Sequence, residues 1–282
     1  MKLSTVSLDG RITWGRIEGQ TFIDVGAVLA SRYRDLKAAV AAGLAGVAEA
    51  GADAATTPVE RLIWLPVIPN PDKILCVGLN YETHRRETGR AEVEHPTIFA
   101  RYANSQTGHL APILRPRVSK ELDFEGELAV VIGTPGRYIS RASAMAHVAG
   151  YACYNDGSVR DFQRHTHQFT PGKNFPSTGA FGPWMMTPDE LGDIGRLRLQ
   201  TRLNGEIVQE ARIEQMIFVI ARQIEYCSTF TRLEPGDVLV TGTPGGVGAK
   251  RTPPLWMKPG DVVEVEIENL GVLRNPVEQE AA

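Results

Sequence analysis

The segment Leu122–Gly133 constrains the fold more than any other part of this chain. It opens with acidic residues at alternate positions and finishes as an apolar run rich in β-branched residues, a composition that predicts a β-strand. Strand periodicity places Glu125 and Glu127 on one face, with Cα atoms roughly 6–7 Å apart. Like charges this close repel each other, so a partly buried pair needs either a proton or a cation.

A third acidic residue, Asp156, follows in the segment 154–161. Hard divalent cations prefer carboxylate oxygens as ligands, so the three carboxylates predict a site for Mg²⁺ or Mn²⁺ that water or substrate completes. The alternative interpretation is a solvated strand face on which acidic residues lie scattered. Glu125 and Glu127 alone support the two interpretations equally, and the residues downstream favour the metal site.

Composition limits the class of protein. A chain of 282 residues with 43% hydrophobic and 22% charged residues has the balance of a globular protein that buries a substantial core. Its formal net charge of −3 gives no reason to expect nucleic acid or an anionic membrane as a partner. Cys76, Cys153 and Cys227 stand singly in apolar contexts, as reduced buried thiols do. Without a signal-peptide core or an apolar run of about 18 residues, we expect a cytoplasmic protein.

Turn and helix signals divide the chain into two parts. Residues 2–25 have the composition of short strands separated by Asp9-Gly10 and Glu18-Gly19, which are typical of hairpin turns. An alanine-rich helix is expected over residues 33–50, ended by glycine. The proline-rich loop at 69–72 is the best domain boundary. We therefore expect a small N-terminal domain at 1–68 and a catalytic domain at 69–282.

The larger part is predicted to be rich in strands. Two helices are expected, at 143–149 and 213–230, and long loops of the kind that are usually functional occupy 80–112 and 157–182. Because strands and helices do not alternate as βαβ units, the order favours a mixed, mainly antiparallel β-roll of the α+β, mainly β class over a doubly wound sheet. The expected strands cover Ile74–Gly78, Leu128–Gly133, Arg198–Asn204, Asp237–Thr241 and Val262–Glu268.

The first long loop contains a candidate catalytic pair. His84 and Glu87 are three residues apart, so one helical turn places them on the same face. A carboxylate beside an imidazole orients the ring, fixes its tautomer and raises its basicity, so the pair can take a proton from water. The alternative interpretation is a surface histidine in a charged turn, which would be the commoner case for His84 alone.

The second long loop contains Lys173 between Gly172 and Asn174, where its ammonium group can reach an anionic substrate oxygen. A loop lysine taken by itself is usually solvated. The segment His165-Thr166-His167 resembles a metal-binding pair but has no third nitrogen or sulfur ligand at a suitable spacing. We interpret it as a pocket rim or a surface feature.

The glycine-rich segment 240–248 does not have the pattern of a phosphate-binding loop. Lys250 is followed by Arg251 rather than by serine or threonine, and Pro253-Pro254 blocks the helix whose N-terminus would hold phosphate. We therefore expect a strand end that turns into a tight loop, with Thr243 facing a site.

Short motifs occur along the chain in a characteristic order. They are Val77-Gly78-Leu79-Asn80-Tyr81 with His84 and Glu87, Phe124-Glu125-Gly126-Glu127-Leu128, Asn155-Asp156 with Arg160-Asp161, Gly172-Lys173-Asn174-Phe175, Gly182-Pro183-Trp184, Asn204-Gly205-Glu206, Leu233-Glu234-Pro235-Gly236-Asp237, and Thr241-Gly242-Thr243-Pro244 with Gly246-Val247-Gly248. Each is weakly specific. The ordered set, which spans residues 75–270, resembles the fumarylacetoacetate hydrolase family, particularly its acylpyruvase-like branch.

The resemblance implies a fold, an assembly and a metal site. The fold is the family's β-roll, with residues 1–68 as a variable small N-terminal α/β domain, and the assembly is usually a homodimer. Glu125, Glu127 and Asp156 match the positions of the three metal ligands. The implied cofactor is Mg²⁺ or Mn²⁺.

The resemblance also implies roles in catalysis. His84 and Glu87 match the dyad on a mobile lid that activates water, and Lys173 matches the residue that stabilises developing negative charge. Thr243 matches the residue at the substrate's carboxylate end. The residues implied as substrate contacts are Tyr81, Arg160, Gln163 and Thr243.

The chain departs from the family pattern at two places. After Pro96-Thr97-Ile98-Phe99, relatives commonly carry a lysine, whereas Arg101 stands here. A guanidinium group there could still hold a substrate carboxylate, with a different geometry. The insert 165–168 is also unlike the branch, which indicates a specialised pocket rim.

These residues predict hydrolysis of a C–C bond in a 2,4-diketo acid, such as an acylpyruvate or fumarylpyruvate, to pyruvate and a carboxylic acid. The expected substrate is a small 2-oxo acid, and the residues leave open whether it is a product of aromatic degradation, a sugar-derived diketo acid or a short acylpyruvate. Two other reactions use the same metal: decarboxylation of oxaloacetate, and isomerisation or hydration of a 2-hydroxy-dienoate. A different class of protein, a non-catalytic β-roll with a structural ion, would need the three acids but not His84, Glu87 and Lys173 as well.

Overall fold

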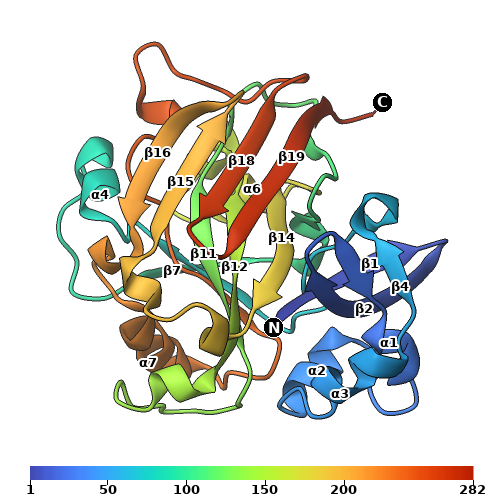
Figure 1. Cartoon of the computed structure of the whole chain (residues 1–282). Coiled ribbons are helices and arrows are strands. Elements are labelled where there is room, and N and C mark those ends of the chain that lie inside the picture. Colours follow the sequence, from blue (N-terminus) through green and yellow to red (C-terminus); the bar gives the residue numbers. More distant parts are fainter. Residues whose placement is uncertain (282) are drawn as a thin grey trace.

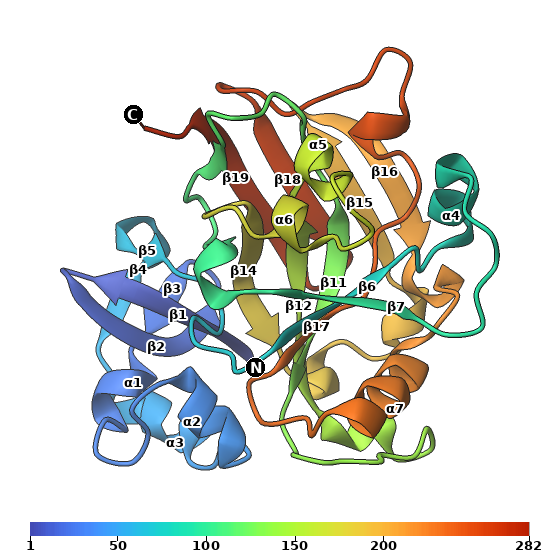
Figure 2. The ribbon, with the colours of Figure 1, turned by 180° about the vertical axis from the view of Figure 1, so that it is seen from behind.

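The computed structural model describes residues 1–281, and its framework is one 12-stranded sheet (Figures 1 and 2). The sheet contains a parallel pair at its β17–β6 step and is otherwise antiparallel along its main path. The strands follow each other in space as β4 (Thr56–Pro58), β3 (Thr21–Ile23), β2 (Arg11–Glu18), β1 (Lys2–Leu8), β14 (Gly179–Met186), β12 (Val148–Asp156), β11 (Gly126–Ile132), β17 (Val238–Val240), β6 (Ile74–Gly78) and β7 (Thr97–Arg101). Beside this path, β5 (Ile63–Trp64) pairs with β1, and β8 (Gln106–Thr107) pairs with β14.

A second sheet of five strands covers one face of the first (Figure 1). Its order is β16 (Glu206–Arg212), β15 (Arg198–Leu203), β18 (Val262–Ile267), β19 (Gly271–Gln279) and β9 (Ile113–Arg115). A short ladder joins β10 (Leu122–Asp123) to β13 (Ser158–Val159). The predicted α+β, mainly β class and the mixed, mainly antiparallel β-roll are confirmed. The five predicted strands of the larger part correspond to β6, β11, β15, β17 and β18, with ends that differ by at most two residues.

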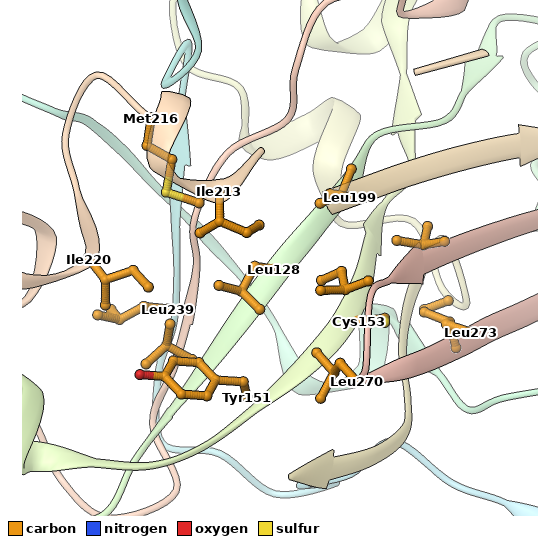
Figure 3. Packing of buried hydrophobic residues seen from close by; sticks show 14 of the residues in the cluster. Leu128, Tyr151, Cys153, Leu199, Ile213, Met216, Ile220, Leu239, Leu270 and Leu273 are labelled. Carbon is orange, nitrogen blue, oxygen red and sulfur yellow. The ribbon is translucent and has the colours of Figure 1, made fainter. Parts of the chain in front are cut away.

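The main hydrophobic core fills the space between the two sheets (Figure 3). Leu128 of β11 and Cys153 of β12 face Leu199 of β15 and Leu273 of β19, and all four side chains are at most 1% exposed. Alternate residues of each strand therefore point into this layer. The core leaves the loops at one end of β11 and β12 free to carry polar residues.

The N-terminal segment shares the main sheet. β1 pairs with β2 on one side and with β14 on the other, where Leu3 lies opposite Met185. The predicted hairpin turns are confirmed, because Asp9-Gly10 and Gly19 adopt left-handed backbone conformations between paired strands. The division of the chain at 69–72 stays a prediction.

The single helix predicted over 33–50 is wrong. Within this range the chain forms α2 (Leu36–Ala41) and α3 (Val47–Ala50) instead, and the short α1 (Val25–Val28) precedes it. Gly43, Leu44 and Gly46 have φ values of 65°, 59° and 76°, and a left-handed residue ends a helix. The alanines favour helix, but the two glycines among them interrupt it.

Tertiary contacts also shorten the other two predicted helices. Within 143–149, only Ala144–His147 forms a 3₁₀ turn, because the next residues begin β12 and pair with β11. Within 213–230, the chain forms a 3₁₀ turn and then α7 (Ile220–Phe230). Asn80 interrupts the helix between the 3₁₀ turn and α7, because its Oδ1 accepts a hydrogen bond from the Phe218 N–H at 2.7 Å. Among residues 1–281, no helix is long and apolar enough to span a membrane.

The two long loops contain short elements of their own. The first includes α4 (Glu82–Thr88), β7 and β8, and the second includes β13, α5 (Arg160–Gln163) and α6 (Thr170–Lys173). Figure 2 shows α5 and α6 close together above the ends of β11 and β12, while α4 projects from the side. The long loops thus surround the polar ends of the two strands.

Candidate active site

The ends of two paired strands bring the predicted metal ligands together. Glu125 precedes β11, Glu127 lies within it, and Asp156 is the last residue of β12. Gly126 lies opposite Asn155 in this pairing, and the Asp156 backbone N–H donates to the Glu125 carbonyl at 2.8 Å. One oxygen atom from each carboxylate lies within 4.8 Å of the others, and the residues are at most 4% exposed. The three predicted ligands therefore form one buried cluster.

Gly126 lets this strand approach the second sheet. A Cβ atom there would lie 1.9 Å from Thr201 Oγ1 of β15. The Gly126 N–H instead donates to Gln209 Oε1 at 3.0 Å. The Glu-Gly-Glu alternation thus directs both carboxylates to one side, while the residue between them packs against the neighbouring sheet.

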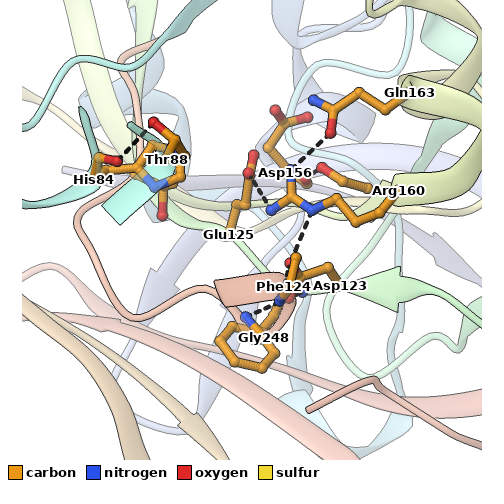
Figure 4. Close-up of polar contacts among 12 residues, drawn as sticks. His84, Thr88, Asp123, Phe124, Glu125, Asp156, Arg160, Gln163 and Gly248 are labelled. Carbon is orange, nitrogen blue, oxygen red and sulfur yellow. Dashed lines mark hydrogen bonds and ion pairs between the residues drawn. The ribbon is translucent and has the colours of Figure 1, made fainter. Parts of the chain in front are cut away.

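Two buried cations lie against the carboxylates. Lys173, at the end of α6, places its Nζ 2.6 Å from Glu125 Oε2 and 2.5 Å from Asp156 Oδ2. Arg160, at the start of α5, donates to Glu125 Oε1 at 2.6 Å and to Asp123 Oδ2 at 2.8 Å (Figure 4). Glu125 is thus held by both cations, and Glu127 by neither. Glu127 Oε2 instead accepts from a backbone N–H in the loop after β17.

Sequence reasoning assigned no role to Asp123, although its place in the acidic alternation carried a signal. Its carboxylate is buried and accepts from the backbone N–H groups of Gly248 and Ala249 at 2.8 and 3.0 Å, as well as from Arg160. Burial raises its pKa. Asp123 therefore joins the glycine-rich loop to the guanidinium group of Arg160.

Arg101 lies behind Asp156 rather than on the wall of the site. Its side chain is fully buried, and its Nη1 donates to Asp156 Oδ1 at 2.6 Å. Arg101 therefore binds a carboxylate of the protein itself. The expectation that it could hold a substrate carboxylate is wrong.

The buried cluster contains four carboxyl groups and three cationic side chains, so one negative charge has no partner when all of these groups are ionised. Burial, Asp156 and Glu125 raise the pKa of Glu127 well above its usual range. Burial opposes ionisation of Glu125 too, but Arg160 and Lys173 outweigh it and lower the pKa of that carboxyl group. The donors are all oxygen atoms, and the uncompensated charge lies at Glu127, so the residues fit a hard divalent cation. The members of the cluster are Asp123, Glu125, Glu127 and Asp156, with Arg101, Arg160 and Lys173.

The predicted dyad forms within α4. His84 Nδ1 lies 2.6 Å from Glu87 Oε1, as the spacing of three residues requires. Glu87 Oε2 accepts from the Gly246 N–H at 2.8 Å, so the glycine-rich loop fixes the carboxylate. The Thr88 hydroxyl donates to the His84 carbonyl at 3.0 Å (Figure 4). Because Glu87 uses Nδ1, the His84 Nε2 atom is left for a substrate or a water molecule.

A cavity of about 810 Å³ connects the dyad with the carboxylate cluster. Glu87 and Asp156 do not line the cavity themselves. They form hydrogen bonds to His84 and Lys173, which do. Apolar side chains form another part of the wall, among them Val77, Leu79, Phe99 and Phe169. The predicted site residues on the wall are His84, Glu125, Glu127, Arg160, Gln163, Lys173 and Thr243.

Two predicted substrate contacts, Tyr81 and Thr243, have hydroxyl groups that are not free to bind a substrate directly. Tyr81 is 1% exposed and lies outside the cavity wall, and its hydroxyl group has no hydrogen-bond partner among residues 1–281. Thr243 lies on the wall, but its hydroxyl group donates to the Gly126 carbonyl and accepts from Gln209. Gln209 carried no signal in the sequence. A direct bond from either hydroxyl group to substrate would require one of these arrangements to change.

The insert His165-Thr166-His167 lies at the cavity, as the pocket-rim interpretation predicted. All three residues are exposed, as are the basic residues Arg164, Lys250 and Arg90, which line the same cavity. The rim is therefore basic, whereas the acidic residues on the wall are confined to Glu125 and Glu127 among the residues described.

Comparison with known proteins identifies the family. The model described as fumarylacetoacetate (FAA) hydrolase C-terminal matches residues 73–278, which is most of the chain. The chain belongs to the fumarylacetoacetate hydrolase family. The resemblance to this family, inferred from the ordered motifs, is thereby confirmed, and the acylpyruvase-like branch stays a prediction.

Relatives in the fumarylacetoacetate hydrolase family carry several enzyme names. The oxaloacetate tautomerase FAHD2A, mitochondrial, of Bos taurus is 42% identical over 222 residues, which cover 78% of this chain and 71% of that protein. Fumarylacetoacetate hydrolase from Exiguobacterium antarcticum matches with a TM-score of 0.86 at 32% identity, over 99% of this chain and 100% of that one. The 5-carboxymethyl-2-hydroxymuconate delta-isomerase from Mycobacterium smegmatis matches with a TM-score of 0.79 at 28% identity, over 100% of both chains. The relatives are thus enzymes named for hydrolysis, isomerisation and tautomerisation.

Proposed function

We propose that this protein is a divalent-metal-dependent enzyme that moves a proton at carbon 3 of a 2-oxo acid, with keto–enol tautomerisation of oxaloacetate as the first reaction to test. The observation that carries the proposal is the His84–Glu87 dyad, which shares a cavity wall with Glu125 and Glu127. A base beside an electrophilic site suits removal of a proton next to a carbonyl group. The tautomerase and isomerase names of the relatives support this choice.

The proposed metal site and dyad have separate tasks. Bound by Glu125, Glu127 and Asp156, Mg²⁺ or Mn²⁺ would supply Lewis-acid chemistry that makes protons beside a 2-oxo group more acidic. In the keto-to-enol direction, His84 takes the carbon-3 proton at Nε2, and the C–H electron pair forms the C2–C3 double bond of the enolate. The enolate oxygen then takes a proton from the imidazolium group or from water, and the reverse reaction returns a proton from His84 to carbon 3. Glu87 keeps the imidazole in the tautomer that leaves this nitrogen unprotonated.

Lys173 and Arg160 stabilise the negative charge that develops on substrate oxygens. Both side chains lie on the cavity wall and are at most 6% exposed, so their charges act in a low dielectric. Gln163 Oε1 accepts from Arg160 Nη1 at 2.9 Å and orients that guanidinium group (Figure 4). Gln163 and Thr243 complete the proposed substrate contacts on the wall.

Hydrolysis of a 2,4-diketo acid is the second candidate. The size of the cavity favours it, because about 810 Å³ with apolar side chains on the wall can take an acyl group that oxaloacetate lacks. In this reaction His84 takes a proton from water, which attacks the distal carbonyl group, and the C–C bond breaks to give pyruvate and a carboxylic acid.

Two further alternatives gain less support. Decarboxylation of oxaloacetate needs no base, so it gives the His84–Glu87 dyad no task. A purely structural ion leaves the cavity, the dyad and the buried Lys173 without a purpose.

One set of reactions separates these candidates. The purified protein is incubated with Mn²⁺, with Mg²⁺ or with EDTA, in D₂O and in H₂O, on oxaloacetate, acylpyruvates, fumarylpyruvate and sugar-derived 2,4-diketo acids. NMR spectroscopy follows deuterium incorporation at carbon 3 and the ratio of keto to enol forms, and product analysis measures pyruvate, carboxylic acids and CO₂. A reaction without protein corrects for metal-catalysed enolisation and decarboxylation.

The expected result is metal-dependent deuterium exchange and enol–keto conversion of oxaloacetate without loss of carbon. Pyruvate with a free carboxylic acid, formed from an acylpyruvate at a higher rate, would move the function to the hydrolase. Pyruvate and CO₂ from oxaloacetate alone would establish the decarboxylase. No turnover of any member of the panel, with the metal bound, would contradict the proposal.

Metal binding is expected to be reversible and to stabilise the protein. An ion that binds the folded chain at 100 times its Kd adds about 2.7 kcal/mol to the free energy of unfolding, so Mn²⁺ should raise Tm by several degrees. EDTA should reverse this increase, and renewed Mn²⁺ should restore both Tm and activity. Differential scanning calorimetry measures the shift. An ion that EDTA removes only by unfolding the chain would favour the structural alternative.

The homodimer and the cytoplasmic location stay predictions. The bovine relative is named as a mitochondrial protein. We propose the homodimer because the family resemblance implies it. Light scattering after size-exclusion chromatography should give about twice the mass of one chain, 30.8 kDa, and a monomer would contradict it.

A further inference from the structure

Arg101 forms a complete set of hydrogen bonds around one side of Asp156. Its Nη1 donates to Asp156 Oδ1 at 2.6 Å and to the Gly157 carbonyl at 3.0 Å. Its Nη2 donates to Thr178 Oγ1 at 2.8 Å and to the Ser105 carbonyl at 3.5 Å, and its Nε donates to Ser105 Oγ at 3.2 Å. A guanidinium group has five N–H donors, so every donor of Arg101 has a partner.

The backbone provides a fitted space for this guanidinium group. Gly179 lies opposite Asp156 in the β12–β14 pairing. A Cβ atom at Gly179 would lie 2.7–2.9 Å from three atoms of the Arg101 guanidinium group. Arg101 is fully buried, so neither the arginine nor the carboxylate it holds can turn away without disturbing the strands. The orientation of the Asp156 carboxylate is therefore fixed.

This orientation divides the two oxygen atoms of Asp156 between different tasks. Oδ1 is taken by the guanidinium group, while Oδ2 faces the Lys173 ammonium group at 2.5 Å on the side of the acidic cluster. Both bonds are charge-assisted, and the arginine bond is reinforced by four others on the same group. An ion in the cluster can therefore compete with the Lys173 ammonium group for Oδ2, whereas Oδ1 stays with Arg101.

We propose that Arg101 is a positioning residue that limits Asp156 to one metal-binding oxygen and so makes the site prefer Mg²⁺ and Mn²⁺ to Ca²⁺. Calcium takes six to eight oxygen ligands and commonly binds a carboxylate through both of its oxygens, whereas magnesium requires six ligands in near-octahedral geometry. Removing Oδ1 from the ligand set penalises the larger ion. The inference rests on the metal site of the proposed function and is independent of the reaction.

The test compares two ions on the purified protein without substrate. Isothermal titration calorimetry gives Kd for Mn²⁺ and for Ca²⁺ with the natural chain and with Arg101→Lys. A lysine keeps the positive charge but has three donors on one atom, so it cannot satisfy the five partners and frees Oδ1. Loss of a residue that orients a ligand typically costs 10- to 100-fold in metal affinity. We expect Mn²⁺ affinity to fall by about tenfold and Ca²⁺ affinity to fall less or to rise.

Arg202→Lys is the matched control. Arg202 also joins two carboxylates on a sheet, with Nε 3.1 Å from Glu264 Oε2 and Nη1 2.6 Å from Glu266 Oε2, but it lies on the second sheet, outside the cluster. Its replacement should leave both Kd values unchanged. An equal loss of affinity for both ions in Arg101→Lys would show a merely structural role and overturn the proposal.

The natural chain by itself provides a second test, which stands if Arg101→Lys does not fold. It must bind Mn²⁺ and Mg²⁺ more tightly than Ca²⁺, and equal or tighter Ca²⁺ binding would overturn the inference. A chain that binds no divalent ion would overturn the proposed metal site itself. Tight Mn²⁺ binding without turnover of any substrate would contradict only the proposed reaction and leave the role of Arg101 standing.

Discussion

Replacement of His84 by asparagine is expected to lower kcat by about 10²- to 10⁴-fold, the usual effect of losing a general base. The amide can occupy the position of Nδ1 and keep a hydrogen bond to Glu87, so the local structure should survive. The atom that is lost is Nε2, the ring nitrogen that Glu87 does not hold, on a side chain that lines the cavity. Because His84 is not a predicted ligand, the Kd for Mn²⁺ should change little. Deuterium exchange at carbon 3 and titration calorimetry measure the two quantities.

Glu87→Gln distinguishes the tasks of the two residues in the dyad. The amide keeps the size of the side chain and can still accept the Gly246 N–H, but it removes the negative charge beside the imidazole. We expect a smaller loss of kcat than for His84→Asn, with Mn²⁺ binding again unchanged. A full rate of exchange in His84→Asn would show that another group moves the proton. A decarboxylase would also keep most of its rate in this variant.

Replacement of Glu127 by glutamine is expected to weaken Mn²⁺ binding by about 100-fold or more, because loss of a direct ligand should cost at least as much as loss of a residue that orients one. Glu127 is the carboxyl group that no cation of the cluster pairs with, and glutamine keeps its shape but cannot ionise to bind the metal. Activity at low metal concentration and the Mn²⁺-dependent rise in Tm should both disappear. Titration calorimetry and scanning calorimetry measure these losses.

The same variant is expected to be more stable than the natural chain when no metal is present. Burial and two neighbouring carboxylates raise the pKa of Glu127 in the folded state. The metal-free protein therefore loses stability as the pH rises from the pKa of an unfolded glutamate towards this raised pKa, and glutamine removes the loss. For the same reason, protons compete with Mn²⁺ for the Glu127 carboxylate, so the natural chain should bind Mn²⁺ more tightly as the pH rises.

Glu121→Gln is the control for Glu127→Gln. Glu121 directly precedes the segment Leu122–Gly133 and forms a partly exposed ion pair with Arg164. Exposed pairs of this kind contribute little, so both Tm and metal binding should stay unchanged. A Glu127→Gln variant that binds Mn²⁺ as tightly as the natural chain would exclude Glu127 as a ligand. Without metal, a Glu127→Gln variant that is less stable than the natural chain would contradict the proposed repulsion between Glu127 and the neighbouring carboxylates.

The sequence by itself determined those features that depend on neighbouring residues. Strand periodicity predicted β11 and the shared face of Glu125 and Glu127, and helical spacing predicted the contact between His84 and Glu87. The ordered motifs identified the family without any coordinates. These predictions succeeded because the relevant distances are fixed by backbone geometry over a few residues.

Only the tertiary structure decided where the predicted helices break and which charges meet. Asn80 divides the helix expected over 213–230 through a hydrogen bond to a residue 138 positions later. Lys173 and Arg101 lie on opposite oxygens of Asp156, although they come from different loops. The partner of Arg101, a protein carboxylate rather than a substrate, follows from the register of β12 against β14 and the space at Gly179. Strand pairing sets such contacts between distant residues, and no local pattern in the sequence encodes them.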